Sequence, residues 1–176
     1  MSLKIEAAED LIVLPEPLRW VVVHTRPRCE KKLADAAERE GIRAYVPLIA
    51  RTHAYGRRKR TFLSPLFTGY AFCCGDAPQR RWLSQNQNTA NLLDVFDQET
   101  LVVQLRHVQT ALKSGLLVDV KPFLETGRQV RITSGPLRGA EGVIVRISGK
   151  MRVLLSVDMI QQAAVVEVDS AALAPL

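Results

Sequence analysis

The sequence has little cysteine, few aromatic residues and no long apolar run. The spacing of its three cysteines, Cys29, Cys73 and Cys74, suits neither a zinc site nor a disulfide framework, so we expect reduced thiols, as in a cytoplasmic protein. No uninterrupted apolar stretch approaches the roughly 18 residues that a membrane-spanning helix needs. The run at 11–14 is too short for the apolar core of a signal peptide, and Pro15 ends it. These absences predict a soluble intracellular protein.

The usual arrangements of catalytic residues are also missing. No paired carboxylates, cluster of metal ligands or nucleophile with a nearby base stands out from the sequence. His53 and His107 are isolated, and Gly149-Lys150 is not a phosphate-binding loop because Ile144 occupies the position of its first glycine. We therefore expect a binding protein that needs neither a metal nor a cofactor, rather than an enzyme.

Positive charge is concentrated in the first half of the chain. The net charge is +6, and 47% of the 176 residues are apolar, which is enough for a packed core. Residues 19–75 carry twelve Lys or Arg against four acids, whereas residues 114–176 carry seven against six. A basic region of this kind is typical of a protein that contacts a polyanion such as nucleic acid. A solvated basic surface is the alternative.

The first half predicts an α+β fold. Residues 1–18 are acidic and interrupted by proline, which is typical of a flexible leader. Trp20-Val21-Val22-Val23 is a continuous apolar run, as in a central strand. A helix is expected to begin near Arg28, after Pro27, and to end at Gly41. A second strand is expected over residues 44–49.

A basic hairpin is expected next. Gly56 interrupts a stretch from Arg51 to Thr61 that has no acid, which predicts a hairpin with a basic tip and return strand. A strand at 66–74, a short helix at 78–86 and a strand at 91–96 should follow. Asp97 is a plausible N-cap for a helix with one apolar face, formed by Leu101, Leu105, Val108 and Leu112. This order predicts an α+β sandwich over residues 19–113.

The second half predicts only strands. Residues 114–126 contain Gly115 and Pro122 without clear periodicity, which indicates a linker. Apolar residues then alternate at 129–133, 142–147, 151–157 and 163–168. A small closed β-barrel over residues 127–176 is the economical solution for so few residues, and the linker should tether it freely.

Three segments together resemble the NusG/RfaH family of transcription elongation factors. They are the strand Trp20–His24, the segment Pro65-Leu-Phe-Thr-Gly-Tyr-Ala-Phe72, and a glycine-rich loop at 135–142 that is similar to a KOW motif. The resemblance covers about residues 19–175. It implies a ferredoxin-like NGN domain at 19–113 and an SH3-like KOW barrel at 127–176. The basic run at 58–60 and the Pro-Leu-Phe at 65–67 are more similar to the specialised RfaH-like branch.

The resemblance implies a non-catalytic elongation and antitermination factor. Its N-terminal domain would dock on the clamp helices of the largest subunit of RNA polymerase and reduce pausing or termination. Its KOW domain would recruit a further factor, either Rho or a small-subunit ribosomal protein. A monomer that does not bind membranes is expected.

Four residues are candidates for polymerase binding. Tyr70 and Phe72 are two apart in an expected strand and therefore share a face, which we expect to be an exposed apolar patch. His24 matches a family position beside that patch. Phe67 belongs to the same motif, although regular alternation would point it to the opposite face. Each aromatic residue could instead belong to the core.

Six cations are candidates for nucleic-acid binding, and five residues belong to the KOW loop. The cations are Arg26, Arg28, Arg57, Arg58, Lys59 and Arg60, of which the last four are consecutive. A solvated hairpin tip remains the alternative for them. In the loop, we expect Gly135, Gly139 and Gly142 to have a structural role, with Pro136 and Leu137 at its exposed tip.

A different class of function stays open. The KOW barrel could be the main contact of an RNA-binding or ribosome-associated protein that does not bind polymerase directly. The nearly neutral charge of the second half, +1 over residues 114–176, weakens this alternative.

Overall fold

The computed structural model describes residues 17–55, 58–122, 127–147 and 150–176. The N-terminal module contains β1 (Arg19–Thr25), α1 (Glu30–Arg39), β2 (Arg43–Tyr45), β3 (Leu48–Tyr55), β4 (Arg58–Pro65), β5 (Tyr70–Gly75), α2 (Ala77–Gln85), β6 (Thr89–Asp94) and α3 (Gln98–Lys113). The C-terminal module contains β7 (Leu117–Pro122), β8 (Arg128–Ile132), β9 (Glu141–Ile147), β10 (Lys150–Val157), the short 3₁₀ turn η1 (Asp158–Ile160), β11 (Gln162–Val166), a second such turn η2 (Ser170–Ala172) and β12 (Leu173–Pro175). The structure confirms the predicted α+β and all-β halves.

The N-terminal sheet has the antiparallel order β2-β5-β1-β6 and is covered on both faces. Val21 and Val23 of β1 pack into a cluster with α1 and α2, whereas Trp20 and Val22 belong to the cluster that contains α3. A strand that is buried on both sides needs apolar residues at every position. The continuous run in β1 therefore correctly predicted its central place in the sheet.

The ends of the helices follow local backbone chemistry. Arg28 has a φ of +61°, a left-handed conformation that cannot continue a helix, so α1 begins at Glu30 rather than near Arg28. Gly41, with a φ of +70°, follows the helix, as predicted. Asp97 caps α3 by accepting a hydrogen bond from the backbone N–H of Thr100 at 2.9 Å, which confirms the predicted N-cap.

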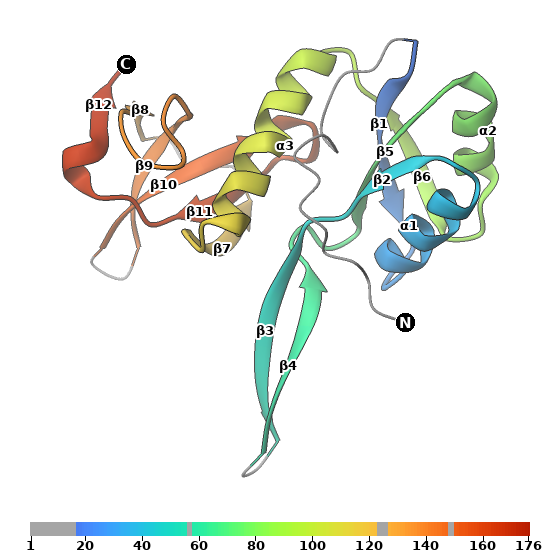
Figure 1. Cartoon of the computed structure of the whole chain (residues 1–176), viewed down its shortest axis with the longest axis horizontal. Coiled ribbons are helices and arrows are strands. Elements are labelled where there is room, and N and C mark those ends of the chain that lie inside the picture. The colour runs from blue at the N-terminus through green and yellow to red at the C-terminus, as the bar shows by residue number, and fades with distance from the viewer. Residues whose placement is uncertain (1–16, 56–57, 123–126, 148–149) are drawn as a thin grey trace.

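The predicted strand at 66–74 is wrong in its first half. Residues 66–69 form a turn, in which the Tyr70 amide donates to the Phe67 carbonyl at 3.2 Å, and β5 begins only at Tyr70. The preceding residues belong to β4, which pairs with β3 from Leu48↔Pro65 to Tyr55↔Arg58. This hairpin projects away from both modules (Figure 1). The predicted basic hairpin is thus present.

The C-terminal module is one antiparallel sheet in the order β12-β8-β9-β10-β11-β7. Among the described residues no pairing joins the end strands β12 and β7, so the predicted closure of the barrel is not detected. β7 lies inside the predicted linker at 114–126 and pairs with β11. The alternation of Val118 and Val120 with Asp119 and Lys121 is typical of a strand. Gly115 and Pro122 favoured a linker instead, so the strand was missed.

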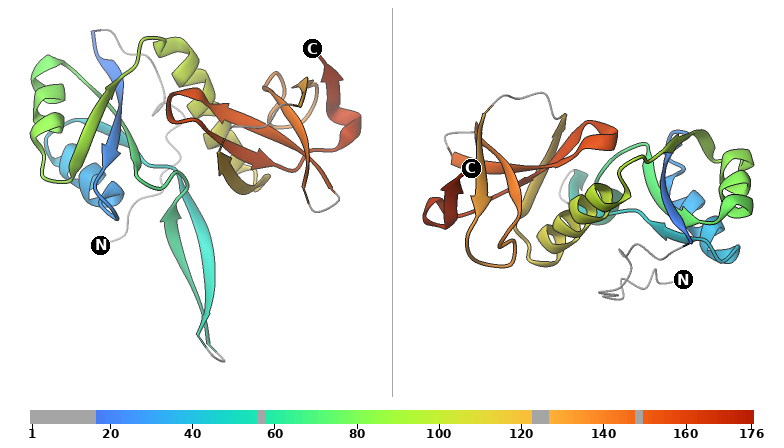
Figure 2. Two further views of the ribbon diagram at one scale, coloured as in Figure 1. Left: turned by 180° about the vertical axis from the view of Figure 1, so that it is seen from behind. Right: turned by 90° about the horizontal axis from the view of Figure 1, so that it is seen from above.

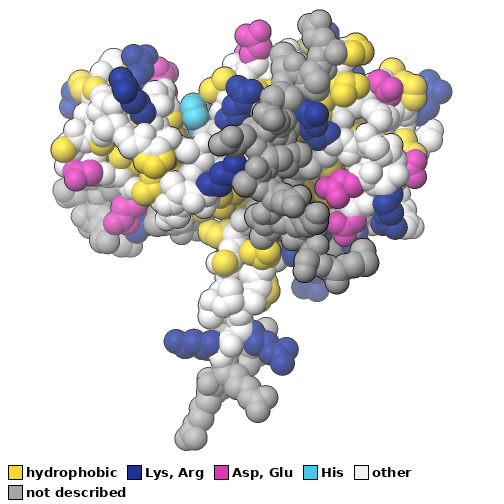
Figure 3. Space-filling view, viewed as in Figure 1, with side chains coloured by type: hydrophobic (Ala, Val, Ile, Leu, Met, Phe, Trp, Pro, Cys, Tyr) yellow, Lys and Arg dark blue, Asp and Glu magenta, His cyan; other side chains and the backbone are white. Residues whose placement is uncertain are grey.

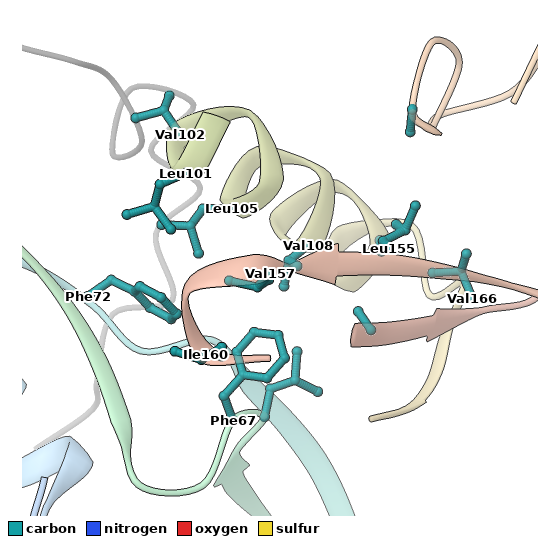
Figure 4. Packing of buried hydrophobic residues seen from close by; sticks show 14 of the residues in the cluster. Phe67, Phe72, Leu101, Val102, Leu105, Val108, Leu155, Val157, Ile160 and Val166 are labelled. Carbon is teal, nitrogen blue, oxygen red and sulfur yellow. The ribbon is translucent and has the colours of Figure 1, made fainter. Parts of the chain in front are cut away.

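The two modules share one hydrophobic cluster, with α3 between their sheets (Figures 1 and 2). Leu105 and Val108 of α3 pack in the same cluster as Leu155, Val157 and Val166 of the C-terminal sheet (Figure 4). The prediction of a freely tethered C-terminal module is therefore wrong. Docking removes an apolar face of each module from water, and the hydrophobic effect therefore favours the docked arrangement.

In the part of the chain that the structure describes, no helix is long and apolar enough to cross a membrane.

Candidate functional site

His24 and Tyr70 form a ring pair at one end of the N-terminal sheet. They are direct neighbours in the β1–β5 register, and their ring centroids lie 5.3 Å apart at an angle of 35°. His24 is exposed and Tyr70 is half-buried. The pair therefore offers a partly accessible aromatic surface, which is a common component of protein–protein interfaces.

A buried carboxylate holds the turn that positions these rings. Glu30 is only 3% exposed, and its Oε1 accepts a hydrogen bond from the Gly69 amide at 2.7 Å. The Gly69 carbonyl in turn accepts from the Thr25 amide at 2.8 Å, and the φ of Gly69 is +86°, which favours glycine. Sequence reasoning missed Glu30 because an acid in the first turn of a helix usually lies in solvent.

Phe67 and Phe72 are both buried, so the prediction of an exposed patch is wrong for Phe72. They are 1% and 0% exposed, with ring centroids 6.2 Å apart in an edge-to-face arrangement. The turn at 66–69 breaks the strand alternation and brings Phe67 into the same cluster as Phe72. Val157 and Ile160 of the C-terminal module belong to that cluster, and Figure 4 shows Ile160 beside both rings.

Polar contacts accompany this apolar interface. Gln104 of α3 donates from Nε2 to the Asp158 carboxylate at 2.6 Å and accepts from the Asp158 amide at 3.1 Å. His107, one helical turn further along α3, is half-buried. Burial lowers the pKa of His107, and the negative charge of Glu141 on β9 partly opposes this shift. The interface thus holds a neutral imidazole near neutral pH.

The cations predicted to bind nucleic acid lie in two places. Lys59 and Arg60 are exposed on β4, and Arg51, which was not among the predicted residues, is exposed on β3. Figure 3 shows basic side chains on the projecting hairpin. Only the backbone of Arg58 is described, and Arg57 lies outside the described residues.

The other two predicted cations lie between β1 and α1. Arg26 and Arg28 are exposed on this connection, which follows the strand that ends with His24 and Thr25. They therefore lie near the start of the first helix, as the sequence indicated, and apart from the hairpin cations. The base of the hairpin is tied to the same region, because Lys31 Nζ of α1 donates to the Leu63 carbonyl at 2.5 Å.

The glycine-rich loop between β8 and β9 is structural. Gly135 and Gly139 have φ values of +78° and +88°, and Gly142 lies so close to β10 that an added Cβ would be 2.3 Å from the Leu154 carbonyl oxygen. Pro136 is exposed, as predicted. Leu137 is 2% exposed, so its predicted place at the exposed tip is wrong: the turn folds it into the core.

The described residues contain little that could perform covalent chemistry. Among them, no group of His, Cys, Asp and Glu could hold a metal ion. Burial, with a smaller contribution from neighbouring Cys74, raises the pKa of the Cys73 thiol to about 12, so this thiol stays protonated and a poor nucleophile.

Comparison with known proteins agrees with this organisation. The family model "Transcription termination factor nusG" matches residues 18–112, and a KOW motif model matches residues 126–157. The chain is similar to the structure "Domain interaction in Thermotoga maritima NusG", with 19% identity and a TM-score of 0.53, over 89% of this chain and 96% of that chain. This likeness shows a common fold.

Two further solved structures are more distant. They are conformations A and B of the MjSpt4:Spt5 complex, with 14% identity, TM-scores of 0.27 and 0.28, and coverage of 89% of this chain and 97% and 96% of those chains. None of the curated proteins matches this chain.

Proposed function

The chain belongs to the NusG family of transcription factors, and we propose that it binds RNA polymerase through the face that carries His24, Phe67, Tyr70 and Phe72. Binding there would place the N-terminal module on the clamp helices of the largest subunit and reduce pausing or termination. The role is one of binding and not of catalysis. Membership of the specialised RfaH-like branch stays a prediction.

One observation supports this proposal above others. Phe67 and Phe72 of the aromatic face belong to a hydrophobic cluster that also contains Val157 and Ile160 of the C-terminal module. An apolar face that is covered by a separate module can be offered to another protein without unfolding either module. Polymerase binding would therefore require the C-terminal module to move away from α3.

The proposal includes a second contact and a second partner. The exposed cations of the β3–β4 hairpin, together with Arg26 and Arg28, would contact nucleic acid in the transcription complex. The released C-terminal module would recruit a further factor, either Rho or a ribosomal protein of the small subunit.

The competing function, an RNA-binding KOW protein without polymerase contact, receives little support from the C-terminal charges. Arg131 pairs with Glu141 at 2.5 Å, and Arg152 lies 3.7 Å from Glu167. Residues 114–176 carry seven cations against six acids, and two of these cations are paired in this way, so a strongly basic RNA-binding surface is not favoured there.

Co-purification of the full-length protein with core RNA polymerase tests the proposal. Tyr70→Ala should weaken binding by about thirtyfold or more, because aromatic anchors in interfaces contribute about 2–4 kcal/mol. Phe96→Ala is the matched control: Phe96 is 95% exposed and follows β6 at the opposite end of the sheet, beyond the Val21↔Asp94 pair. Equal binding by a folded Tyr70→Ala protein would contradict the assignment.

A further inference from the structure

The β3–β4 hairpin is a long ribbon that packs against neither module along most of its length. Each strand has eight residues, and the two pair from end to end, which gives a length of about 26 Å. Figures 1 and 2 show it projecting from the body. Residues 48–65 include five Lys or Arg and no acid. A solitary two-stranded ribbon is marginally stable, and like charges weaken it further, so this ribbon is expected to meet an anionic partner.

The register divides the ribbon into two different faces. Arg51 is paired with Phe62 and Thr52 with Thr61, and successive residues in a strand point to opposite faces. The hydroxyl oxygens of Thr52 and Thr61 lie 2.8 Å apart, which confirms that these two side chains meet on one face. Arg51 and Phe62 therefore occupy the other face.

Two cations can now be assigned to faces. Arg60 is two residues from Phe62 and shares its face, so Arg51, Arg60 and Phe62 together form what we call the arginine face. Lys59 shares the opposite face, which we call the threonine face, with the two threonines. All of these residues are exposed. The long guanidinium groups and the ring are thus gathered on one side.

We propose that this ribbon lies in the major groove of duplex DNA with its arginine face towards the base edges. The proposal rests on the nucleic-acid contact proposed above and names its ligand. The major groove of B-form DNA is about 12 Å wide and admits a two-stranded β-ribbon. Arginine can donate two hydrogen bonds to guanine O6 and N7, and a phenyl ring can contact the thymine methyl group.

Two other nucleic acids fit this ribbon less well. The major groove of A-form RNA is deep and narrow, so side chains on a ribbon cannot reach its bases. Proteins that bind single strands stack successive bases on several aromatic rings. The ribbon has two aromatic residues, Tyr55 and Phe62, against five Lys or Arg, a composition that suits phosphate and base-edge contacts better than the stacking of successive bases. Duplex DNA is therefore the ligand that shape and side chains favour.

Fluorescence anisotropy with the full-length protein tests the choice of ligand. The probes are a mixed-sequence duplex DNA of about 24 base pairs, roughly three times the length of the ribbon, the duplex RNA of the same sequence, and each DNA single strand. Duplex DNA should bind at least about tenfold more tightly than the other probes. Methyl green, which occupies the major groove, should displace the protein, whereas the minor-groove ligand netropsin should not. Equal or tighter binding of RNA or of single strands, or displacement by netropsin, would overturn the proposal.

Two variants that each remove one charge test the assignment of faces. Arg60→Gln should weaken duplex binding by about tenfold or more, because a base-edge contact is lost with the charge. Lys59→Gln, the adjacent control on the threonine face, should weaken it by less than about threefold at the same salt concentration. Both side chains are exposed, so folding should be unaffected. Equal losses of duplex affinity in the two variants would contradict the proposal that only the arginine face contacts the bases.

The two proposals fail in different ways. If the ribbon proposal is right, Arg60→Gln should still co-purify with polymerase, and Tyr70→Ala should bind duplex DNA like the unchanged protein. If the unchanged protein prefers duplex DNA but does not bind polymerase, only the proposed polymerase contact is contradicted. If it binds polymerase but prefers RNA or single strands, only the ribbon proposal is contradicted.

Discussion

Gln104 and Asp158 form a reciprocal pair of hydrogen bonds across the two modules. The Gln104 amide donates to the Asp158 carboxylate at 2.6 Å, and its carbonyl oxygen accepts from the Asp158 amide at 3.1 Å. Fifty-four residues separate the two in sequence, so this contact exists only while the C-terminal module is docked. It lies on the segment that leads to Ile160, which covers the aromatic face.

Breaking this pair should favour separation of the modules. We expect Asp158→Ala to increase polymerase binding by about fivefold, because exposed hydrogen bonds of this kind contribute about 1 kcal/mol. Titration of polymerase with the labelled protein measures the effect. Gln104→Ala should behave alike, and the double variant should gain little more than either single one, since both remove the same contact. Unchanged affinity in all three variants would show that docking does not limit binding.

The buried Glu30 should be needed for the aromatic turn. Glu30→Ala leaves the Gly69 amide without its present acceptor, and we expect a loss of about 1–3 kcal/mol in the free energy of unfolding. Glu30→Gln keeps an acceptor oxygen at the same length, so it should cost less. Urea denaturation compares the two variants. Equal destabilisation by both would mean that the charge, and not the hydrogen bond, stabilises the turn.

His107 should make stability depend on pH. Burial lowers the pKa of His107 in the folded protein. As pH falls, His107 therefore takes up a proton in the unfolded chain at a higher pH than in the folded protein. The folded protein should therefore be fully stabilised above about pH 6.5 and lose stability as pH falls from there through the lowered pKa. Thermal unfolding between neutral and mildly acidic pH measures this slope. His107→Gln, which removes the titrating group, should flatten the slope, and an unchanged slope in this variant would contradict the assignment.

Gly142, the second residue of β9, should be harder to replace than the glycines of the loop that precedes this strand. An added Cβ would lie 2.3 Å from the Leu154 carbonyl oxygen and 2.7 Å from a methyl carbon of Val153, so β9 and β10 must separate. We expect Gly142→Ala to cost more than about 2 kcal/mol in the free energy of unfolding. Gly135→Ala meets open space and should cost only about 1–2 kcal/mol for its positive φ. Chemical denaturation distinguishes them, and equal costs would contradict the close approach.

Much of the fold could be predicted because it depends on local pattern. The continuous run in β1 indicates a strand buried on both faces, Asp97 marks the start of α3, and Gly41 marks the end of α1. The basic hairpin followed from Gly56 and the absence of acid around it. These features depend on period, capping and backbone conformation, which act over a few residues.

The site was only partly predictable because burial depends on distant partners. The two modules, the hairpin and the aromatic motif at 65–72 are all evident from the order of residues along the chain. Three features depend on the folded arrangement: Phe67 and Phe72 pack with the C-terminal module, Glu30 holds Gly69, and β7 joins the second sheet. The hydrophobic effect has no direction, so a pattern shows that a side chain prefers to leave water but not which surface will cover it.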